Sequence, residues 1–191
     1  MRKYHELLFD SSRTDIMGVL DYDMKNFDLT KLWLGEKVKG GIPKDVVLFV
    51  DNTNIEHTDY VGNPITWIIM SDKLINLMYG YIKDDVEILD VNLFNQSESK
   101  YVKGFHVINP LRKIKCLDVE KSILSYPVDE EFKDLGFTVI KPVLKIKDIP
   151  EHVHLFRLEE AKNIIIFSDS LAQSLRGKGI NGVAFVKLDT T

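Results

Sequence analysis

The sequence predicts an α+β fold: a single domain over residues 1–191, built on a mixed, mostly antiparallel sheet with two short helices. Three observations lead to this prediction. Apolar runs of strand length, rich in β-branched residues, recur along the chain, as in Val46–Val50 and Ile164–Phe167. Two such runs lead directly into a helical pattern. No linker-like or low-complexity segment divides the chain, and 191 residues fit one domain with a substantial core.

The clearest unit lies near the C-terminus and has the pattern strand, capped helix, glycine, strand. Ile164–Phe167 is the first strand. Ser168 comes next, at the position of a helix N-cap, where its hydroxyl can accept a hydrogen bond from a free N–H of the first turn. Asp169 suits the positive end of the helix dipole, and Gly177 is suited to end the helix. Val183–Leu188 then resumes the strand pattern.

A similar unit occurs earlier in the chain. Residues 68–91 align without a gap onto residues 165–188, with seven identities in 24 positions. The identities fall at the strand, the cap, the helix anchor and the glycine: Ile68, Ile69, Ser71, Asp72, Leu74, Gly80 and Val86. Either the two units are repeats, or any strand–helix–strand unit needs these residue types. In both cases the pattern predicts that Ser71 and Ser168 are helix N-caps and that the two helices come from two similar units.

The N-terminal third is predicted to be mainly strand. Tyr4–Phe9 and Met17–Tyr22 have strand patterns, and Leu29–Leu34 favours a short helix with Trp33 facing the core. Asp51–Pro64 is polar and resembles a surface loop, which is a frequent place for functional residues.

The middle of the chain contains the clearest hairpin. Val86–Phe94 is predicted to be one long strand that pairs with Tyr101–Ile108, in which Tyr101, Phe105 and Val107 share a face. Tyr126–Asp134 is a polar excursion, and Phe137–Ile146 is a strand with Ile140 turned inward. The predicted core consists of Ile69, Leu74, Met78, Leu89, Val91, Phe105, Phe156, Ile166, Leu171, Leu175 and Phe185.

Composition narrows the class of protein. The net charge is −4, from 29 acidic and 25 basic residues, which argues against a general nucleic-acid binder. The one cysteine, Cys116, rules out an internal disulfide framework and fits a reducing compartment. The N-terminus lacks the apolar core of a signal peptide, and no run approaches the roughly 18 apolar residues of a membrane helix. The sequence therefore predicts a cytoplasmic protein.

The sequence gives little support to catalysis. His152 and His154 would share one face of an extended segment and form a possible metal pair, but no third ligand stands at a recognised spacing. The motifs of a P-loop, a nucleophile elbow and a zinc-type cysteine set are absent from the sequence. We therefore expect no enzyme, no bound metal and no cofactor. A metal-dependent hydrolase using His152 and His154 is one alternative, and a small-ligand or scaffolding module is another.

Several stretches together carry the pattern of a known family. They are Trp67–Leu74, Tyr101–Ser122, His154–Leu158, Ile165–Asp169 and Gly179–Phe185. The C-L-D-x-E-K-S and F-R-L…S-D…G-I-x-G-x-x-F pieces are the specific part of it. Over about residues 60–188 the chain resembles the bacterial polymorphic-toxin immunity family numbered eleven, formerly described as a domain of unknown function.

The resemblance implies a protein that binds a cognate toxin domain from a sister cell and blocks it. It implies no catalytic residue. From the charge balance and the lack of a long apolar run, we expect neither nucleic acid nor a membrane as a partner. Polar excursions at Asp51–Pro64 and Tyr126–Asp134 are the segments expected to meet the toxin. The predicted contact residues are Asn54, His57, Asp59, Asp129 and Glu130.

Overall fold

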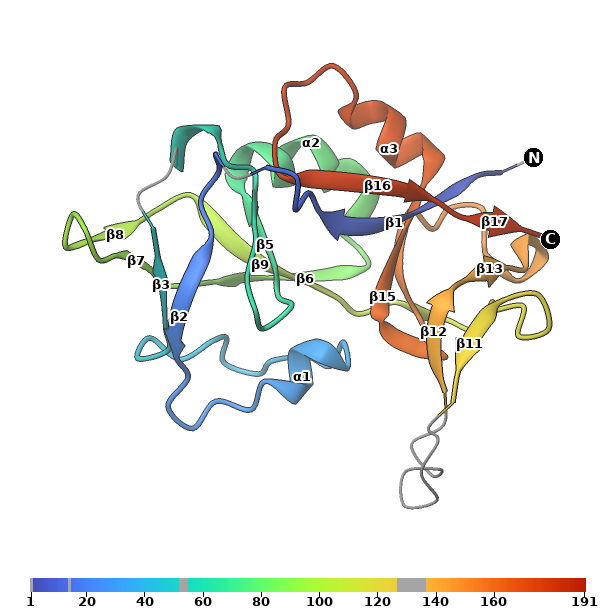
Figure 1. Ribbon diagram of the computed structural model, residues 1–191, viewed down its shortest axis with the longest axis horizontal. Helices are drawn as coiled ribbons and strands as arrows, with labels where there is room; N and C mark the ends of the chain where they lie inside the picture. The colour runs from blue at the N-terminus through green and yellow to red at the C-terminus, as the bar shows by residue number, and fades with distance from the viewer. Residues whose placement is uncertain (1, 14, 52–54, 127–136) are drawn as a thin grey trace.

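The computed structural model describes residues 2–13, 15–51, 55–126 and 137–191, and it has the predicted α+β class (Figure 1). The helices are α1 (Thr30–Trp33), α2 (Asp72–Ile82) and α3 (Asp169–Leu175), with 3₁₀ turns η1 (Ile55–His57) and η3 (Ile146–Asp148). The strands are β1 (Tyr4–Phe9), β2 (Val19–Asp23), β3 (Val47–Val50), β4 (Tyr60–Val61), β5 (Ile68–Ser71), β6 (Val86–Asp90), β7 (Leu93–Asn95), β8 (Lys100–Val102), β9 (Phe105–Pro110), β10 (Lys113–Ile114), β11 (Ile123–Ser125), β12 (Thr138–Lys141), β13 (Val143–Leu144), β14 (Leu155–Leu158), β15 (Ala161–Ser168), β16 (Val183–Lys187) and β17 (Asp189–Thr190).

Two sheets of the same design form the centre of the molecule. One has the order β4-β5-β9-β6, and the other contains β14-β15-β1-β16 with β10 added in parallel beside β14. Within the two four-stranded sets, every neighbouring pair is antiparallel. In each set the second strand leads into a helix, α2 or α3, and the helix leads to the fourth strand, β6 or β16. The two similar units are confirmed, although they build two sheets and not one.

The cap positions of the two units match in detail. Ser71 and Ser168 are both helix N-caps, as predicted, and each hydroxyl accepts from the backbone N–H three residues further on at 3.2 Å. The Ser71 N–H donates to the Asp59 carbonyl at 2.9 Å, and the Ser168 N–H donates to the His154 carbonyl at 3.0 Å. The shared backbone geometry favours the repeat over a chance likeness of residue types.

The third strand of each unit has a different origin. In the first unit it is β9, which comes after β6, β7 and β8 along the chain. In the second it is β1, the first strand of the protein, which lies between β15 and β16. The residue before each of these strands accepts from the first helical residue: Gly104 O from Asp72 N at 2.8 Å, and Lys3 O from Asp169 N at 2.9 Å. The N-terminal strand therefore completes the C-terminal unit.

Three apolar clusters hold the layers together. The central cluster joins α2 and α3 to the facing sides of both sheets, through residues such as Met70, Leu74, Phe167 and Leu171. The far side of the first sheet packs against an outer sheet of order β2-β3-β7-β8 and against α1. The far side of the second sheet packs against the segment that contains β11, β12 and β13. The predicted core is confirmed as buried, except that Val91 and Phe185 are half-buried.

Three predicted strands are wrong, because each is two strands in different sheets. Val86–Phe94 divides into β6 and β7, since the Asn92 side-chain amide donates to the Lys44 carbonyl at 2.8 Å and draws the chain toward β3. Tyr101–Ile108 divides in the same way into β8, which pairs with β7, and β9, which pairs with β6, so Tyr101 and Phe105 lie in different sheets. Phe137–Ile146 divides into β12 and β13 around Pro142, and Ile140 is exposed where an inward side chain was predicted.

The ends of two helices also differ from the prediction. In α1 the buried residue is Leu32, whereas Trp33 is 42% exposed and does not face the core. The Trp33 indole N–H donates to the Ile65 carbonyl at 2.8 Å, which holds the ring at the surface. Helix α2 runs past Gly80 to Ile82, so Gly80 does not end it, while Gly177 comes after α3 with a φ of +69° as a glycine there should.

Candidate functional site

The outer sheet carries a row of aromatic side chains on the face turned away from the core. Asp21 on β2 is in register with Phe49 on β3, Phe49 with Phe94 on β7, and Phe94 with Tyr101 on β8. The ring centroids are 6.2 Å apart for Phe49 and Phe94 and 5.2 Å apart for Phe94 and Tyr101, both in edge-on contact. With the neighbouring Leu20, these residues form what we call the ladder face.

Two side chains at the edges of the ladder face are largely exposed, whereas Phe49 and Phe94 at its centre are half-buried. Leu20 is 64% exposed, because a register shift between Val19 and Asp21 makes it the extra residue of a bulge. Tyr101 is 55% exposed at the opposite edge of the sheet. A half-buried aromatic centre with exposed apolar and tyrosine side chains at its edges is found on surfaces that bind other proteins, where tyrosine is enriched.

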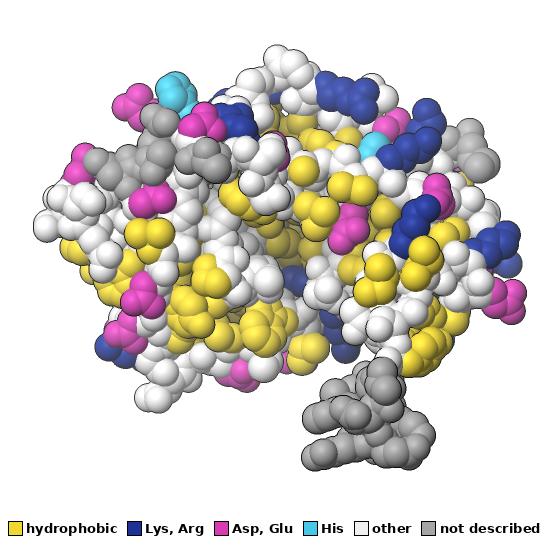
Figure 2. All heavy atoms as spheres, in the orientation of Figure 1, with side chains coloured by type: hydrophobic (Ala, Val, Ile, Leu, Met, Phe, Trp, Pro, Cys, Tyr) yellow, Lys and Arg dark blue, Asp and Glu magenta, His cyan; other side chains and the backbone are white. Residues whose placement is uncertain are grey.

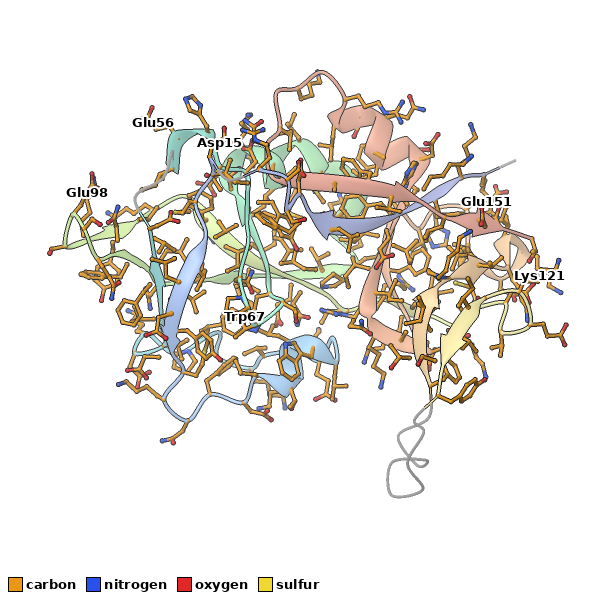
Figure 3. All side chains as sticks on the ribbon, viewed as in Figure 1. Asp15, Glu56, Trp67, Glu98, Lys121 and Glu151 are labelled. Atoms are coloured by element: carbon orange, nitrogen blue, oxygen red, sulfur yellow. The ribbon has the colours of Figure 1, made fainter. Side chains whose placement is uncertain are left out.

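A groove of about 470 Å³ adjoins the ladder face. It lies between η1 and the edge strand β8, and Tyr101 belongs to both the groove and the ladder face. The other lining residues are Ile55, Glu56, His57, Glu98, Lys100, Val102 and Lys103. Figure 3 shows Glu56 and Glu98 at the same end of the molecule. Lys100 is paired with Glu98 at 2.6 Å, so the polar wall of the groove is partly neutralised within the chain.

The segment around the ladder face is acidic. Residues 15–63 contain nine Asp and Glu against five Lys and Arg, a difference equal to the net charge of −4 of the whole chain. In Figure 2, acidic side chains border the hydrophobic ones over β2 and β3. Two of the acids have basic neighbours: Asp23 pairs with Lys25 and Asp15 with Arg13, each at 2.6 Å. These exposed pairs hold the pKa of both carboxyl groups below their usual values.

The predicted contact residues fall into three groups. His57 is exposed and lines the groove beside β8. Asn54, Asp129 and Glu130 lie outside the described residues. Asp59 is buried, which argues against a direct contact with a partner.

Asp59 is buried because residues 55–64, within the predicted surface loop Asp51–Pro64, do not form an exposed loop. This segment contains η1 and β4, and Thr58 through Val61 are buried. The Asp59 carboxylate accepts from Ser71 Oγ at 2.7 Å, from the Asn181 N–H at 3.0 Å and from Lys73 Nζ at 3.2 Å. Asp59 therefore positions elements of both units.

A second groove, of about 660 Å³, opens between α1 and the β14–β15 turn, where Figure 2 shows the surface hollowed. Its apolar wall is formed by Trp33, Leu34 and Pro64, and its opposite side by Glu159, Glu160, Lys162 and Asn163. A cavity of about 40 Å³, lined by Trp67 and Arg157, shares Trp33 with this groove.

Arg157 is buried next to this groove without an acidic partner among the described residues. Its guanidinium donates to the Leu32, Lys162 and Pro110 carbonyls at 2.8–2.9 Å. Burial lowers the pKa of Arg157 to about 10. Because backbone carbonyls take up its short hydrogen bonds, Arg157 ties α1 and two strand ends together.

The histidine pair considered as a metal site is used differently in the structure. His154 Nδ1 lies 2.8 Å from Ser168 Oγ at the start of α3, and burial lowers the pKa of its imidazole. Across residues 2–13, 15–51, 55–126 and 137–191 there is no group of three potential metal-ligating His, Cys, Asp or Glu side chains.

An aromatic row exposed at its Tyr101 end, an adjoining groove and a second groove with an apolar wall are surface features that a binding site can use. The family comparison gives the class a name: the chain belongs to the immunity protein family Imm11, whose model matches residues 12–190. That family is non-enzymatic, and the chain is not an enzyme. A comparison with curated proteins finds no match. Among the described helices, none has the length and apolar character to cross a membrane.

The family match covers more of the chain than the resemblance did, and it adds β2 and β3, two of the four strands of the ladder face. Sequence reasoning missed that face. Phe49 lies within the uninterrupted apolar run Val46–Val50, which hides the alternation between inner and outer side chains. Its partner Phe94 lies across a parallel pairing of distant strands, for which a sequence pattern gives no signal.

Proposed function

We propose that this protein neutralises a cognate bacterial toxin domain by binding it directly in the cytoplasm, within a polymorphic toxin system. The observation that carries the proposal is the immunity-family match over residues 12–190. In this proposal residues 1–191 act as one domain. Binding of the toxin requires no metal or cofactor, and neither nucleic acid nor a membrane is a partner.

The ladder face and its groove support the proposal. A partner held against a rigid sheet loses access to its own substrate by steric exclusion, and tight binding requires a well-packed centre with a polar rim. The aromatic side chains of the outer sheet would form the centre of the interface, and the polar side chains of the groove beside β8 would form part of its rim. In this proposal His57 is a contact in the groove, and Asn54, Asp129 and Glu130 are further contacts.

Co-expression tests the proposal. The toxin domain encoded by the neighbouring gene is expressed in cells with and without this protein, and surviving colonies are counted. We expect survival only when this protein is present, and a stable complex in size-exclusion chromatography. If the toxin kills equally in both cases and no complex forms at micromolar concentration, the protein is not an immunity protein for that toxin.

A further inference from the structure

We propose that the ladder face docks a basic surface of the toxin domain, with lysine or arginine side chains laid over its aromatic rings and paired with Asp21. The inference rests on the proposed function and specifies its surface and the chemistry of its partner. It is carried by the aromatic row, by the exposure of Tyr101 and Asp21 at its two ends, and by the acidic segment that contains β2 and β3.

The aromatic row suits cations. The four residues in register occupy four neighbouring strands, so the row extends about 14 Å from Asp21 to Tyr101. The face of a tyrosine or phenylalanine ring attracts an ammonium or guanidinium group within about 6 Å. A partner that fills such a row must present several basic side chains and not a single one.

The charge of the neighbourhood selects the sign of the partner. Residues 15–63, which include β2, β3 and η1, carry eight acidic residues besides the buried Asp59, against five basic residues. Asp21 is exposed, and its Oδ1 accepts from the adjacent Tyr22 N–H at 2.8 Å, a contact that leaves the charge of the carboxylate directed to solvent. An acidic rim steers a basic protein toward the aromatic row and repels an acidic one.

The groove beside Trp33 has no comparable preference for a basic partner. Its rim holds Glu159 and Glu160 against Lys162, and Arg157 is engaged by backbone carbonyls below it. Binding at the two surfaces should therefore respond to different substitutions. A basic partner on the ladder face is sensitive to Tyr101 and Asp21, whereas a partner in the groove is sensitive to Trp33.

The experiment measures binding of the purified toxin domain from the neighbouring gene to full-length variants of this protein. Tyr101→Ala should weaken binding at least about tenfold, as loss of an aromatic anchor does. The matched control is Tyr79→Ala on α2, because Tyr79 is 50% exposed against 55% for Tyr101. Asp21→Lys should weaken binding about tenfold or more through slower association, and should flatten its salt dependence. Glu120→Lys, the same charge change at another exposed residue, is its control and should stay within about twofold.

Thermal unfolding of each variant checks that the fold is intact. We expect unchanged unfolding temperatures, because the substituted side chains are exposed. The inference is overturned if Tyr101→Ala and Asp21→Lys bind as the unaltered protein does, or if Asp21→Lys binds more tightly. It is also overturned if Trp33→Ala weakens binding while the two ladder variants do not. In these outcomes the immunity role stands. If the unaltered protein neither binds nor protects, the proposed function fails, and this inference with it.

Discussion

The two strand–helix–strand units share a backbone but differ in the side chain beside the capping serine. In the first unit Ser71 Oγ donates to the Asp59 carboxylate at 2.7 Å. In the second, Ser168 Oγ meets the His154 imidazole at 2.8 Å. A buried carboxylate and a titratable ring therefore occupy equivalent places.

Each of these side chains also connects its own unit to the other one. Asp59 accepts from the Asn181 N–H in the segment after α3, and the His154 ring meets the Tyr81 ring, near the end of α2, edge-on at 5.0 Å. The connection is a hydrogen bond to a carboxylate on one side and an aromatic contact on the other. The two units thus share the cap hydroxyl and the backbone around it, whereas the side-chain contacts that connect one unit to the other differ in chemistry.

The largest expected effect comes from removing residues 1–9. This truncation separates the two units, because only the second unit loses its third strand. β15 and β16 would lose their common neighbour, and the buried Tyr4 and Leu7 would leave the core. We expect loss of cooperative unfolding in circular dichroism and of dispersed amide signals in NMR. A truncated protein with native spectra would contradict the role given to β1.

Next in size is the loss of a helix anchor. Leu74 and Leu171 occupy the same position in the two helices, and both are fully buried in the central cluster. Leu74→Ala and Leu171→Ala should each lower the free energy of unfolding by about 2–5 kcal/mol. Urea denaturation measures both. A loss below about 1 kcal/mol at either site would mean that the two anchors are not equivalent.

Replacing the cap serines sharpens the comparison. Ser168→Ala should cost about 1 kcal/mol, the usual value for a lost N-cap. Ser71→Ala should cost about 2 kcal/mol, because the second partner of Ser71 is the buried Asp59 carboxylate, whereas the second partner of Ser168 is the half-buried His154 ring. Equal losses in denaturant titrations would show that the Asp59 bond adds no more than the His154 contact.

The smallest effect is a dependence on pH that belongs to the second unit. Burial lowers the pKa of His154 below its ordinary value of 6.5, so the folded protein binds this proton less readily than the unfolded chain. The stability that His154 contributes is thus complete above about pH 6.5 and is lost as the pH falls through that value. Unfolding free energies measured between about pH 7.5 and pH 5 should fall. In His154→Gln the decline should be shallower, and an unchanged decline would assign it to other groups.

Local rules predicted what is local in this fold. The strand–serine–helix units, both caps and the alternation of the core depend on residues within a few positions of one another. The ladder face and the burial of Asp59 could not be predicted in this way. Both depend on contacts between distant segments, β3 with β7 in one case and Asp59 with Asn181 in the other. The groove residue His57 was identified from the polar character of its segment, although the next four residues, 58–61, are buried.

The position of β1 between β15 and β16 also orders the folding of the protein in time. Every strand of the first unit, from β4 to β9, lies within residues 60–110, so that unit can fold before synthesis of the chain is complete. The second unit must wait, since Tyr4 pairs with Ser168 and His5 with Lys187. A ribosome that stalls before β16 would release a chain with its first unit folded and its second open. The apolar side chains of β1 would then be exposed to proteases and to other nascent chains.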